Sequence, residues 1–390
     1  MVKEMVEIIF KYFEIVVYTL FAINSAYLFC FALASLFYKP KKYKRSEAVL
    51  KFLVLIPAYK EDNVIVNSAL SALDQDYPSE KMVVAVVSDR MKSETNLSLE
   101  KSGANVIIFE PESSSKAKAL NYAFSSYANM DFDVVVILDA DNIVENSFIA
   151  TLNDAFVSGC NAIQAHRTAK NLETEVAVLD AISEEINNSI FRRGHIAMGL
   201  SSALIGSGMA FKFNWFKGAV NKLSTAGEDK ELEILLLKEG IFIDYLDNLL
   251  VFDEKTKKES VYYNQRRRWI AAQFYSLSTA LKWLPEAVRS INISYIDKVF
   301  QWTMPPRVVL LGLVFLIAGF ISIYDINIAI RWALLLFVVV LSLAISVPMK
   351  MVRSLSLKSL IKLPKLFLLT ILNFFRTKGA VKKFIHTPKN

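Results

Sequence analysis

The stretch Val134-Val135-Val136-Ile137-Leu138-Asp139-Ala140-Asp141 indicates how this chain of 390 residues folds. Five apolar residues in succession suit a strand that is buried on both faces of a sheet, and two carboxylates follow at its end. Similar apolar runs occur at 50–56, 82–87 and 105–109, with segments of helical spacing between them. This alternation predicts an α/β domain with a mostly parallel sheet flanked by helices.

Polar residues follow several of these predicted strands. In parallel sheets, ligands bind beyond the carboxyl ends of the strands. The segments 57–61, 88–90 and 139–141 are therefore the first candidates for a binding site.

The composition favours a membrane over a nucleic acid as partner. Hydrophobic residues make up 54% of the chain and charged residues 21%, which excludes a disordered protein, and the mean hydropathy is +0.34. The 45 Lys and Arg exceed the 38 Asp and Glu by 7, and a modest basic excess in an apolar chain is typical of a cytoplasmic membrane surface. Cys30 and Cys160 are too few for a disulfide framework or a cysteine metal cluster.

Three apolar segments, 15–37, 308–324 and 332–349, predict membrane-spanning helices. The first has no charged residue and is longer than the roughly 20 residues that a helix needs to cross a bilayer. Basic residues follow at 39–45 and again at 350–365, so the positive-inside rule puts the N-terminus outside and both the central domain and the C-terminus in the cytoplasm. We therefore expect a multi-pass protein of the inner (cytoplasmic) membrane. A cleaved signal peptide is disfavoured because the first apolar run is too long.

Two more segments are predicted to lie at the membrane surface. The segment 354–375 mixes apolar residues with Lys at helical spacing and predicts an interfacial helix, with a tilted spanning helix as the alternative. These features divide the chain into an N-terminal helix with a basic flank (1–45), a cytoplasmic domain (46–280), an interfacial segment (281–307), a transmembrane hairpin (308–349) and an interfacial helix with a cytoplasmic tail (350–390).

Asp139 and Asp141 form a D-x-D pattern at a predicted strand end. Their oxygens suit a Mg²⁺ or Mn²⁺ ion whose other ligands are substrate phosphates, and a turn or helix cap is the alternative. Lys116 and Lys118 lie near the start of a predicted helix, where they either grip a diphosphate or are simply solvated.

Three later motifs also admit two interpretations. Glu228 and Asp229 precede an amphipathic helix, where they either cap it or supply a general base. Gly206-Ser207-Gly208 leaves room for a substrate to approach the backbone, or forms an ordinary bend. Gln265-Arg266-Arg267-Arg268-Trp269 offers a phosphate ligand and a flat ring for a sugar, or a basic surface beside the membrane. The histidines at 166, 195 and 386 show no metal-ligand spacing.

The order of these motifs resembles that of the processive family 2 glycosyltransferases, which include the synthases of cellulose, chitin, hyaluronan and poly-N-acetylglucosamine. The series runs through Pro57-Ala58-Tyr59-Lys60-Glu61, Asp89, Lys118, Asp139-Ala140-Asp141, Glu228-Asp229 and Gln265-Arg266-Arg267-Arg268-Trp269. The tail Phe384-Ile385-His386-Thr387-Pro388-Lys389 is similar to the family's gating loop. The resemblance implies a GT-A-like, Rossmann-like fold.

The resemblance also implies a role for each matching residue. Nucleotide binding is implied for Tyr59, Glu61, Asp89, Lys118, Asp139, Arg268, Thr387 and Lys389. The implied metal ligands are Asp141 and Asp139, and the implied acceptor contacts are Gly206, Ser207, Gln265 and Trp269. Asp229 matches the catalytic base and Glu228 is its neighbour. Ser88-Asp89-Arg90 departs from the family's commoner acidic pair, and the chain has fewer predicted spanning helices than the large polymer synthases.

The implied reaction is a single displacement with inversion, in which a sugar passes from a UDP-sugar to an acceptor hydroxyl with Mg²⁺ or Mn²⁺ as cofactor. Three hypotheses remain: extension of a polysaccharide, addition of one sugar to a polyprenyl-linked acceptor, and a non-catalytic membrane scaffold. The partners expected are the donor, a polysaccharide or lipid-linked acceptor and membrane lipids, with an export partner or a homo-oligomer left open and no nucleic acid. The sequence does not fix the donor sugar.

Overall fold

The computed structural model describes residues 2–225, 227–257 and 259–376. Its centre is one mixed sheet of eight strands in the order β3-β2-β1-β4-β7-β6-β8-β5. The strands are β1 Phe52–Tyr59, β2 Met82–Asp89, β3 Asn105–Phe109, β4 Val134–Ile137, β5 Ile143–Val144, β6 Ala162–Ala169, β7 Met209–Lys212 and β8 Ile243–Asp253.

The predicted α/β fold is confirmed, with one refinement of the sheet. Strands β3, β2, β1 and β4 are parallel, as the apolar runs predict. Strand β7 then enters antiparallel between β4 and β6, while β6 and β8 are parallel to each other. The chain reaches β7 from the glycine-containing segment at 206–208, so this reversal brings that segment back beside the end of β4, where Gly208 N–H bonds Ile137 O at 2.9 Å.

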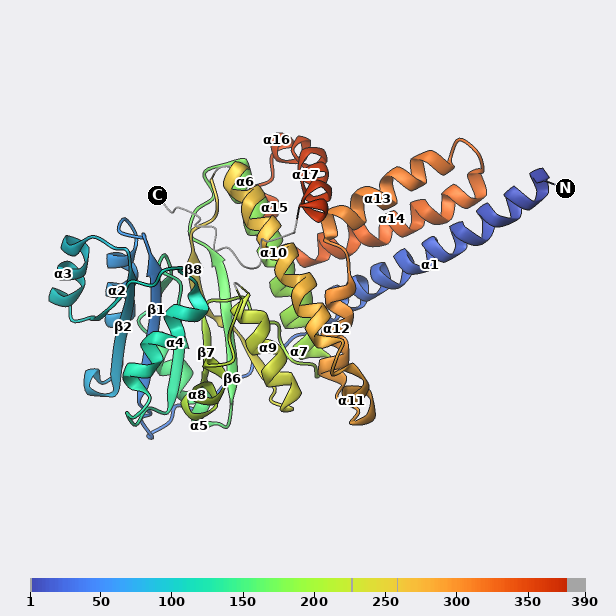
Figure 1. The fold of residues 1–390 in the computed structure, drawn as a ribbon. Coiled ribbons are helices and arrows are strands. Elements are labelled where there is room, and N and C mark those ends of the chain that lie inside the picture. Colours follow the sequence, from blue (N-terminus) through green and yellow to red (C-terminus); the bar gives the residue numbers. More distant parts are fainter. Residues whose placement is uncertain (1, 226, 258, 377–390) are drawn as a thin grey trace.

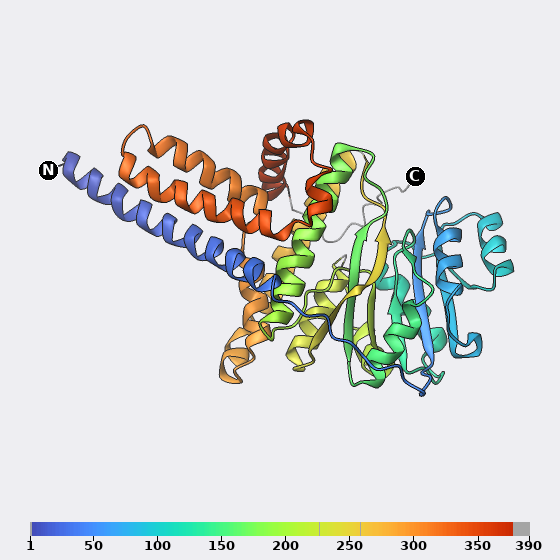
Figure 2. The ribbon, with the colours of Figure 1, turned by 180° about the vertical axis from the view of Figure 1, so that it is seen from behind.

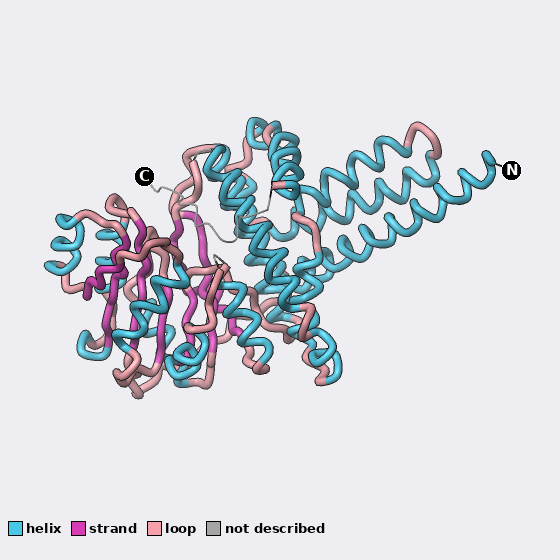
Figure 3. The backbone as a smooth tube through the Cα atoms, in the orientation of Figure 1, coloured by secondary structure: helices cyan, strands magenta, loops and turns pink. Residues whose placement is uncertain are grey.

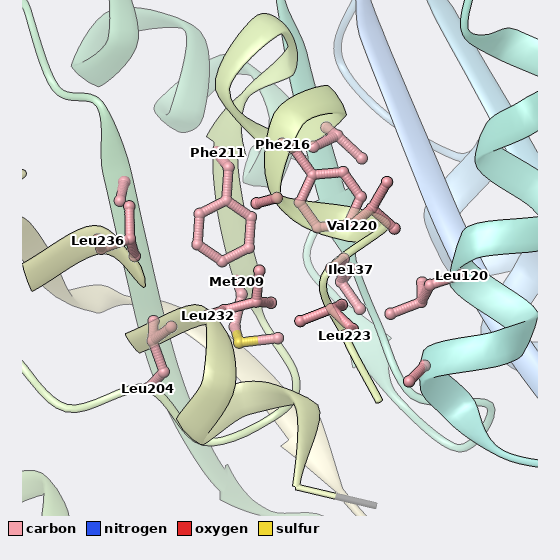
Figure 4. Close-up of a cluster of buried hydrophobic side chains, with 14 of the residues drawn as sticks. Leu120, Ile137, Leu204, Met209, Phe211, Phe216, Val220, Leu223, Leu232 and Leu236 are labelled. Atoms are coloured by element: carbon pink, nitrogen blue, oxygen red, sulfur yellow. The ribbon is translucent and has the colours of Figure 1, made fainter. Parts of the chain in front are cut away.

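Helices cover both faces of the sheet (Figure 1). The helices of this domain are α2 Ile65–Leu73, α3 Ser93–Lys101, α4 Lys116–Tyr127, α5 Phe148–Val157, α6 Glu175–Asn188, α7 His195–Ala197, α8 Phe213–Val220, α9 Glu228–Lys238 and α10 Glu259–Ala280, with a 3₁₀ turn at Ser79–Lys81 and a π-helical turn at Ser189–Gly194. Alternate residues of β1 point to opposite faces, so Leu53 joins the cluster under α4, α8 and α9 while Val54 joins the cluster under α2 and α5. Figure 4 shows the first cluster, where Phe211 and Phe216 pack near Leu232.

Three apolar helices leave the sheet domain together on one side: α1 Val2–Ser35, α13 Arg307–Ile321 and α14 Ile326–Ser346 (Figures 1 and 2). Strands gather at the other end of the molecule (Figure 3). Within the described residues, Glu7–Ser35 and Ile326–Ser346 are long and apolar enough to cross a membrane. A third candidate span exists if α12 Ile293–Thr303 and α13, which meet at a 56° bend, count as one. The predicted apolar helices are thus present, and the predicted hairpin is α13 followed by α14.

The first apolar helix, α1, packs directly against the sheet domain. Gly194, at the end of the π-helical turn, lies so close to the backbone of Phe31 in α1 that no room remains for a Cβ atom. His195 then stacks on the Phe31 ring with a centroid distance of 3.9 Å. The contact fixes α1 against the domain that carries the candidate site.

The remaining helices lie at the junction between the two parts. They are α11 Leu284–Arg289, α12, α15 Met349–Val352, α16 Leu357–Ile361 and α17 Leu363–Phe375. Helix α12 buries Tyr295 and Trp302 in the core of the sheet domain. Helix α17 lies along α10, where Lys362 Nζ is 3.1 Å from Glu259 Oε1, and presents Leu368 and Phe375 outward. The location of this helix at a membrane surface stays a prediction.

Candidate active site

The Asp139 loop is held in place by two buried polar side chains. The Asp139 backbone N–H donates to Asn142 Oδ1 at 2.9 Å and to Ser207 Oγ at 3.1 Å. The Ser207 hydroxyl also bonds Asn142 Oδ1, and its side chain is fully buried. The sequence predicts Ser207 at an acceptor, but the structure places its hydroxyl beneath the loop, where it positions Asp139.

Lys116 joins the loop to two other motifs. Its Nζ lies 2.5 Å from Asp139 Oδ1, donates to Gly206 O at 2.5 Å and lies 3.4 Å from Glu228 Oε1. These neighbouring carboxylates raise the pKa of Lys116 although burial alone would lower it. The ammonium therefore stays charged at the centre of the site.

Lys118, the lysine assigned by the resemblance, lies elsewhere. It is exposed, and its Nζ donates to Ser113 O at 3.1 Å and to Ser113 Oγ at 2.5 Å. The structure therefore places Lys116, and not Lys118, beside Asp139, and the diphosphate contact of Lys118 stays a prediction. The reason is helix geometry: the hydroxyl of Ser115 caps α4, and residues two apart on a helix point to different sides.

The start of α9 faces the same point. Gly206 has a φ of +83°, and a Cβ placed on it would lie 3.8 Å from Glu228 Oε1, 3.9 Å from Asp229 Oδ2 and 3.9 Å from Lys116 Nζ. Gly206 thus lets the backbone approach both carboxylates, and the approach of a substrate to this segment stays a prediction. Burial raises the pKa of Glu228 to about 7, opposed by Lys116 and reinforced by Asp229 and Asp139. Asp229 is the more exposed of the two acids.

Asp141 is 3% exposed, and its Oδ2 accepts the Glu254 backbone N–H at 3.2 Å. No group of three or more His, Cys, Asp or Glu side chains is arranged to hold a metal ion within the described parts of the chain. Asp139, whose side chain is 32% exposed, and Asp141 offer hard carboxylate oxygens of the kind that Mg²⁺ and Mn²⁺ prefer. The pair fits a metal only if a bound phosphate group supplies further oxygens.

The ends of β1 and β2 form a second part of the site. Tyr59 and Asp89 are neighbours in the parallel register, and the next residue of each strand, Lys60 and Arg90, has a positive φ of 54° and 57°. Asp89 is 3% exposed, and its Oδ1 has no hydrogen-bond partner among the described residues. Burial raises the pKa of this carboxyl. Strained backbone beside a buried, unsatisfied acceptor is typical of a ligand site.

Glu61 follows directly on the β1 strand end. It is half-buried, and its backbone N–H contacts Met91 Sδ at 3.1 Å. The residue therefore lies at the same strand ends as Tyr59 and Asp89.

The arginine-rich motif lies on α10. Burial lowers the pKa of Arg268, and the charges of Glu228, Asp139 and Asp229 oppose that shift. Gln265 Oε1 accepts from Thr256 Oγ1 at 3.4 Å.

Trp269 packs against Arg266, which belongs to the same helix and lies between two aromatic rings. The Arg266 guanidinium carbon lies 4.6 Å from the Trp269 ring centroid and 4.7 Å from that of Tyr262. This cation–π sandwich fixes the orientation of the tryptophan ring.

A buried ionic network behind Asp139 was not predicted from the sequence. Its members are Arg167, Glu184, Arg192, Asp253 and Lys255. Arg167 contacts Glu184 at 2.8 Å and reaches to 3.9 Å from Asp139 Oδ2. These cations hold the pKa of Glu184 at about 2 although burial alone would raise it. Arg167 lies inside β6 and belongs to no recognised motif. The only sequence feature that could have drawn attention to it is the pair of polar residues at 166–167 within the strand.

Thr387 and Lys389, predicted to cover the nucleotide, lie outside the described residues. The residues that come together around Lys116 are Asp139, Gly206, Glu228 and Asp229. Tyr59, Glu61 and Asp89 meet at the ends of β1 and β2, Gln265 and Trp269 lie on α10, and Lys118 lies apart.

Residues 50–272 match the family model described as "Glycosyltransferase like family 2". The chain is 24% identical over 257 residues to the "Probable glycosyltransferase YdaM" of Bacillus subtilis (strain 168), covering 60% of this chain and 58% of that protein. It is 23% identical over 266 residues to an "N-acetylglucosaminyltransferase" of Rhizobium leguminosarum bv. viciae, covering 63% and 61%. The chain thus spans less than two thirds of the length of these curated relatives.

Among solved structures, the fold is similar to that of a mannosyltransferase from Pyrobaculum calidifontis, solved in complex with GDP-Man and Mn²⁺. The TM-score is 0.52 at 14% identity, with 85% of this chain and 97% of the other covered. At this identity the likeness concerns the fold, and it extends beyond the sheet domain into the helical part.

Proposed function

Because the chain belongs to glycosyltransferase-like family 2, we propose that it is a membrane-bound inverting β-glycosyltransferase that transfers a sugar from a UDP-sugar to a growing polysaccharide. The observation that carries the proposal is the meeting of Asp139, Glu228 and Gly206 at one ammonium group, that of Lys116. A donor diphosphate bound there would lie beside a charged lysine and the D-x-D pair, with a second carboxylate nearby. Such a site supports charge stabilisation and proton transfer at one point.

The acceptor is activated by Asp229. This carboxylate, with its oxygen close to Gly206, takes the proton from the acceptor hydroxyl as that oxygen attacks the anomeric carbon. One displacement inverts the configuration, so an α-linked nucleotide sugar yields a β-glycoside. Glu228, with its pKa near 7, tunes the charge around Asp229 and Lys116.

The leaving diphosphate is stabilised by cations of the chain. Lys116 and Arg268 lie near Asp139 and hold the negative charge that develops on the leaving oxygen. A Mg²⁺ or Mn²⁺ ion would be held by Asp139 and Asp141 and would supply Lewis-acid stabilisation of the same charge. This revises the role first given to Lys118.

The donor's base and the acceptor occupy opposite sides of this centre. Tyr59, Glu61 and Asp89 hold the uridine, and the unsatisfied Asp89 oxygen accepts a base N–H. Trp269, fixed by Arg266, stacks on the acceptor sugar, with Gln265 and Gly206 beside it. Thr387 and Lys389 cover the nucleotide, a role that rests on the resemblance alone.

A second candidate is the transfer of one sugar to a polyprenyl-linked acceptor. It is favoured by the small apolar bundle of α1, α13 and α14, which offers few helices for a polymer channel. In both cases the catalytic domain lies in the cytoplasm of a multi-pass inner-membrane protein. A non-catalytic scaffold has no need for Asp139, Asp141, Asp229 and Arg268 together.

The test is nucleotide release from a panel of UDP-sugars by the detergent-solubilised protein with Mg²⁺ or Mn²⁺, followed by sizing of the product. UDP-N-acetylglucosamine comes first because two curated relatives are named N-acetylglucosaminyltransferases, and GDP-mannose is included because of the mannosyltransferase fold. Metal-dependent release with a long product supports polymer extension. One added sugar that requires a lipid-linked acceptor supports the second candidate, and no release with any donor and acceptor contradicts both.

A further inference from the structure

Two arginines converge on one serine at the foot of the apolar helices. Arg266 of α10 and Arg307, the first residue of α13, each place Nη2 3.3 Å from Ser183 Oγ. Arg307 Nη2 also donates to Ser183 O at 3.1 Å. Two guanidinium groups that share one hydroxyl repel each other, and an anion between them would relieve that repulsion.

The nearby carboxylates do not balance this charge. Arg266 pairs with Asp180 at 3.0 Å, but no carboxylate lies within 4 Å of Arg307 in the described ranges 2–225, 227–257 and 259–376. Arg266 Nε and Arg307 Nη1 are buried and have no hydrogen-bond partner there. Unpaired buried guanidinium nitrogens are costly, and a phosphate oxygen is the acceptor that suits them best.

The ionic network beside Ser183 does not supply the missing charge. Ser183 precedes Glu184, which is already shared among Arg167, Arg192 and Lys255. The ion pairs extend this network through Asp139 to Lys116 and Glu228. Six cations (Lys116, Arg167, Arg192, Lys255, Arg266 and Arg307) then stand against five carboxylates (Asp139, Asp180, Glu184, Glu228 and Asp253), which leaves a charge of +1. A bound phosphate group, which is negatively charged at neutral pH, would offset this excess.

The position of the arginines indicates where that phosphate comes from. Arg307 begins an apolar helix that leaves the sheet domain (Figure 2), so its guanidinium lies where lipid phosphates lie if α13 enters the bilayer. Arg266, which shares Ser183 with Arg307, stacks on Trp269. The pair therefore connects the membrane side with the ring proposed to hold the acceptor sugar.

We propose that Arg266 and Arg307 form a binding site for the phosphate group of a membrane lipid, which anchors the acceptor while its sugar lies against Trp269. This inference rests on the proposed function, because it names the class of acceptor for that site. Arg266 has a double role: it binds the phosphate and holds the tryptophan ring.

The test is the affinity of the full chain in detergent for farnesyl phosphate, a short polyprenyl phosphate, measured by native mass spectrometry. We expect farnesyl phosphate to bind and farnesol, which lacks the phosphate, not to bind. Arg307→Gln should weaken binding about ten- to a hundredfold. Arg289→Gln is the matched control, since this exposed arginine of α11 contacts only Glu286 among the described residues, and it should leave the affinity unchanged.

Asp180→Asn gives a result that misfolding cannot imitate. It removes the carboxylate that competes with the phosphate for Arg266, so farnesyl phosphate should bind more tightly. Phosphatidic acid is tested in the same way. If its binding is weakened by Arg307→Gln and strengthened by Asp180→Asn, the site is supported and the phosphate group is that of a phospholipid. Inorganic phosphate that binds as tightly as farnesyl phosphate overturns the proposal that a lipid carries the anion.

Binding of UDP separates this site from the donor site. Arg307→Gln should leave the UDP affinity unchanged; a loss equal to that for farnesyl phosphate overturns the proposal, because Arg307 would then belong to the donor site. An equal farnesyl phosphate affinity in wild type and Arg307→Gln also overturns it. Loss of all sugar transfer in the wild type with lipid-phosphate binding intact contradicts the proposed function alone.

Discussion

The ammonium of Lys116 lies 3.4 Å from the carboxylate of Glu228, two residues that belong to different helices on one face of the sheet. The same ammonium lies 2.5 Å from Asp139 Oδ1. One cation therefore holds together two acidic motifs that would repel each other without it.

Replacing Lys116 with Met should abolish turnover, with a loss of at least about a hundredfold in kcat/KM, because Asp139 and Glu228 would face each other without a counter-charge. Lys118→Met is the matched control from the same helix turn and should keep near wild-type activity. Nucleotide release measures both. Equal losses in the two variants would contradict the assignment to Lys116.

Replacing Asp229 with Asn should remove transfer but not donor binding. The amide keeps the size of the side chain but cannot accept the acceptor proton at neutral pH. We expect kcat to fall about 10²- to 10⁴-fold with the UDP affinity within a factor of about three. Steady-state kinetics and UDP titration check this, and unchanged transfer would reject Asp229 as the base.

Asp89→Asn should weaken UDP binding about tenfold and leave the protein equally or more stable. Its buried Oδ1 has no hydrogen-bond partner among the described residues and lies 4.0 Å from Arg90 Nε. Burial raises the pKa of this carboxyl, so its charge at neutral pH lowers the stability of the folded state. Calorimetric titration and thermal unfolding report the two effects separately. Lower stability with unchanged UDP binding would indicate a structural carboxylate instead.

The raised pKa of Glu228 makes stability depend on pH. Because the folded pKa, about 7, exceeds the ordinary value of 4.5, this group stabilises the fold below about pH 4.5 and loses that contribution as the pH rises to about 7. The unfolding temperature of the wild type should therefore fall relative to that of Glu228→Gln across this interval. Above about pH 7 the difference between the two unfolding temperatures should no longer change. A difference that is constant from pH 4.5 to 8 would show that Glu228 ionises normally.

Lys298 and Glu233 test the link between α12 and α9. Their side chains are 3% and 2% exposed, and Nζ lies 2.8 Å from Oε1. Lys298→Met should destabilise the protein by about 3–5 kcal/mol because it leaves a buried carboxylate alone. Adding Glu233→Leu should recover part of this loss in thermal unfolding, and additive effects of the two changes would show that the pair does not interact.

The strands and apolar helices were predictable because each depends on local patterns. The apolar residues 52–56 of β1 and 134–137 of β4 follow one another without a polar interruption, a pattern that favours burial on both faces of a sheet. The antiparallel entry of β7 was not predictable, because Met209–Lys212 is a short strand whose direction is set by the chain's return from the Gly206 segment.

The site was predictable at the level of motifs but not of single side chains. Lys116 and Lys118 are equal by composition, and only the helix start at Lys116 decides which one turns toward Asp139. Ser207 belongs to a motif that predicts an acceptor contact, yet its hydroxyl accepts a hydrogen bond from the Asp139 backbone and holds the Asp139 loop. Arg167 carried none, and tertiary packing alone brings it to Asp139.

The close contact between Gly194 and Phe31, which leaves no room for a Cβ atom, fixes the position of α1 relative to the sheet domain. Since the backbone of α1 rests directly on the turn that carries Gly194, the proposed active site keeps a fixed distance from α1 and from the bilayer that this helix is proposed to enter. Under the proposed function, an acceptor must then be presented at that distance from the membrane. A bulkier residue at this position would change the reach of the enzyme toward its acceptor while the donor site stays intact.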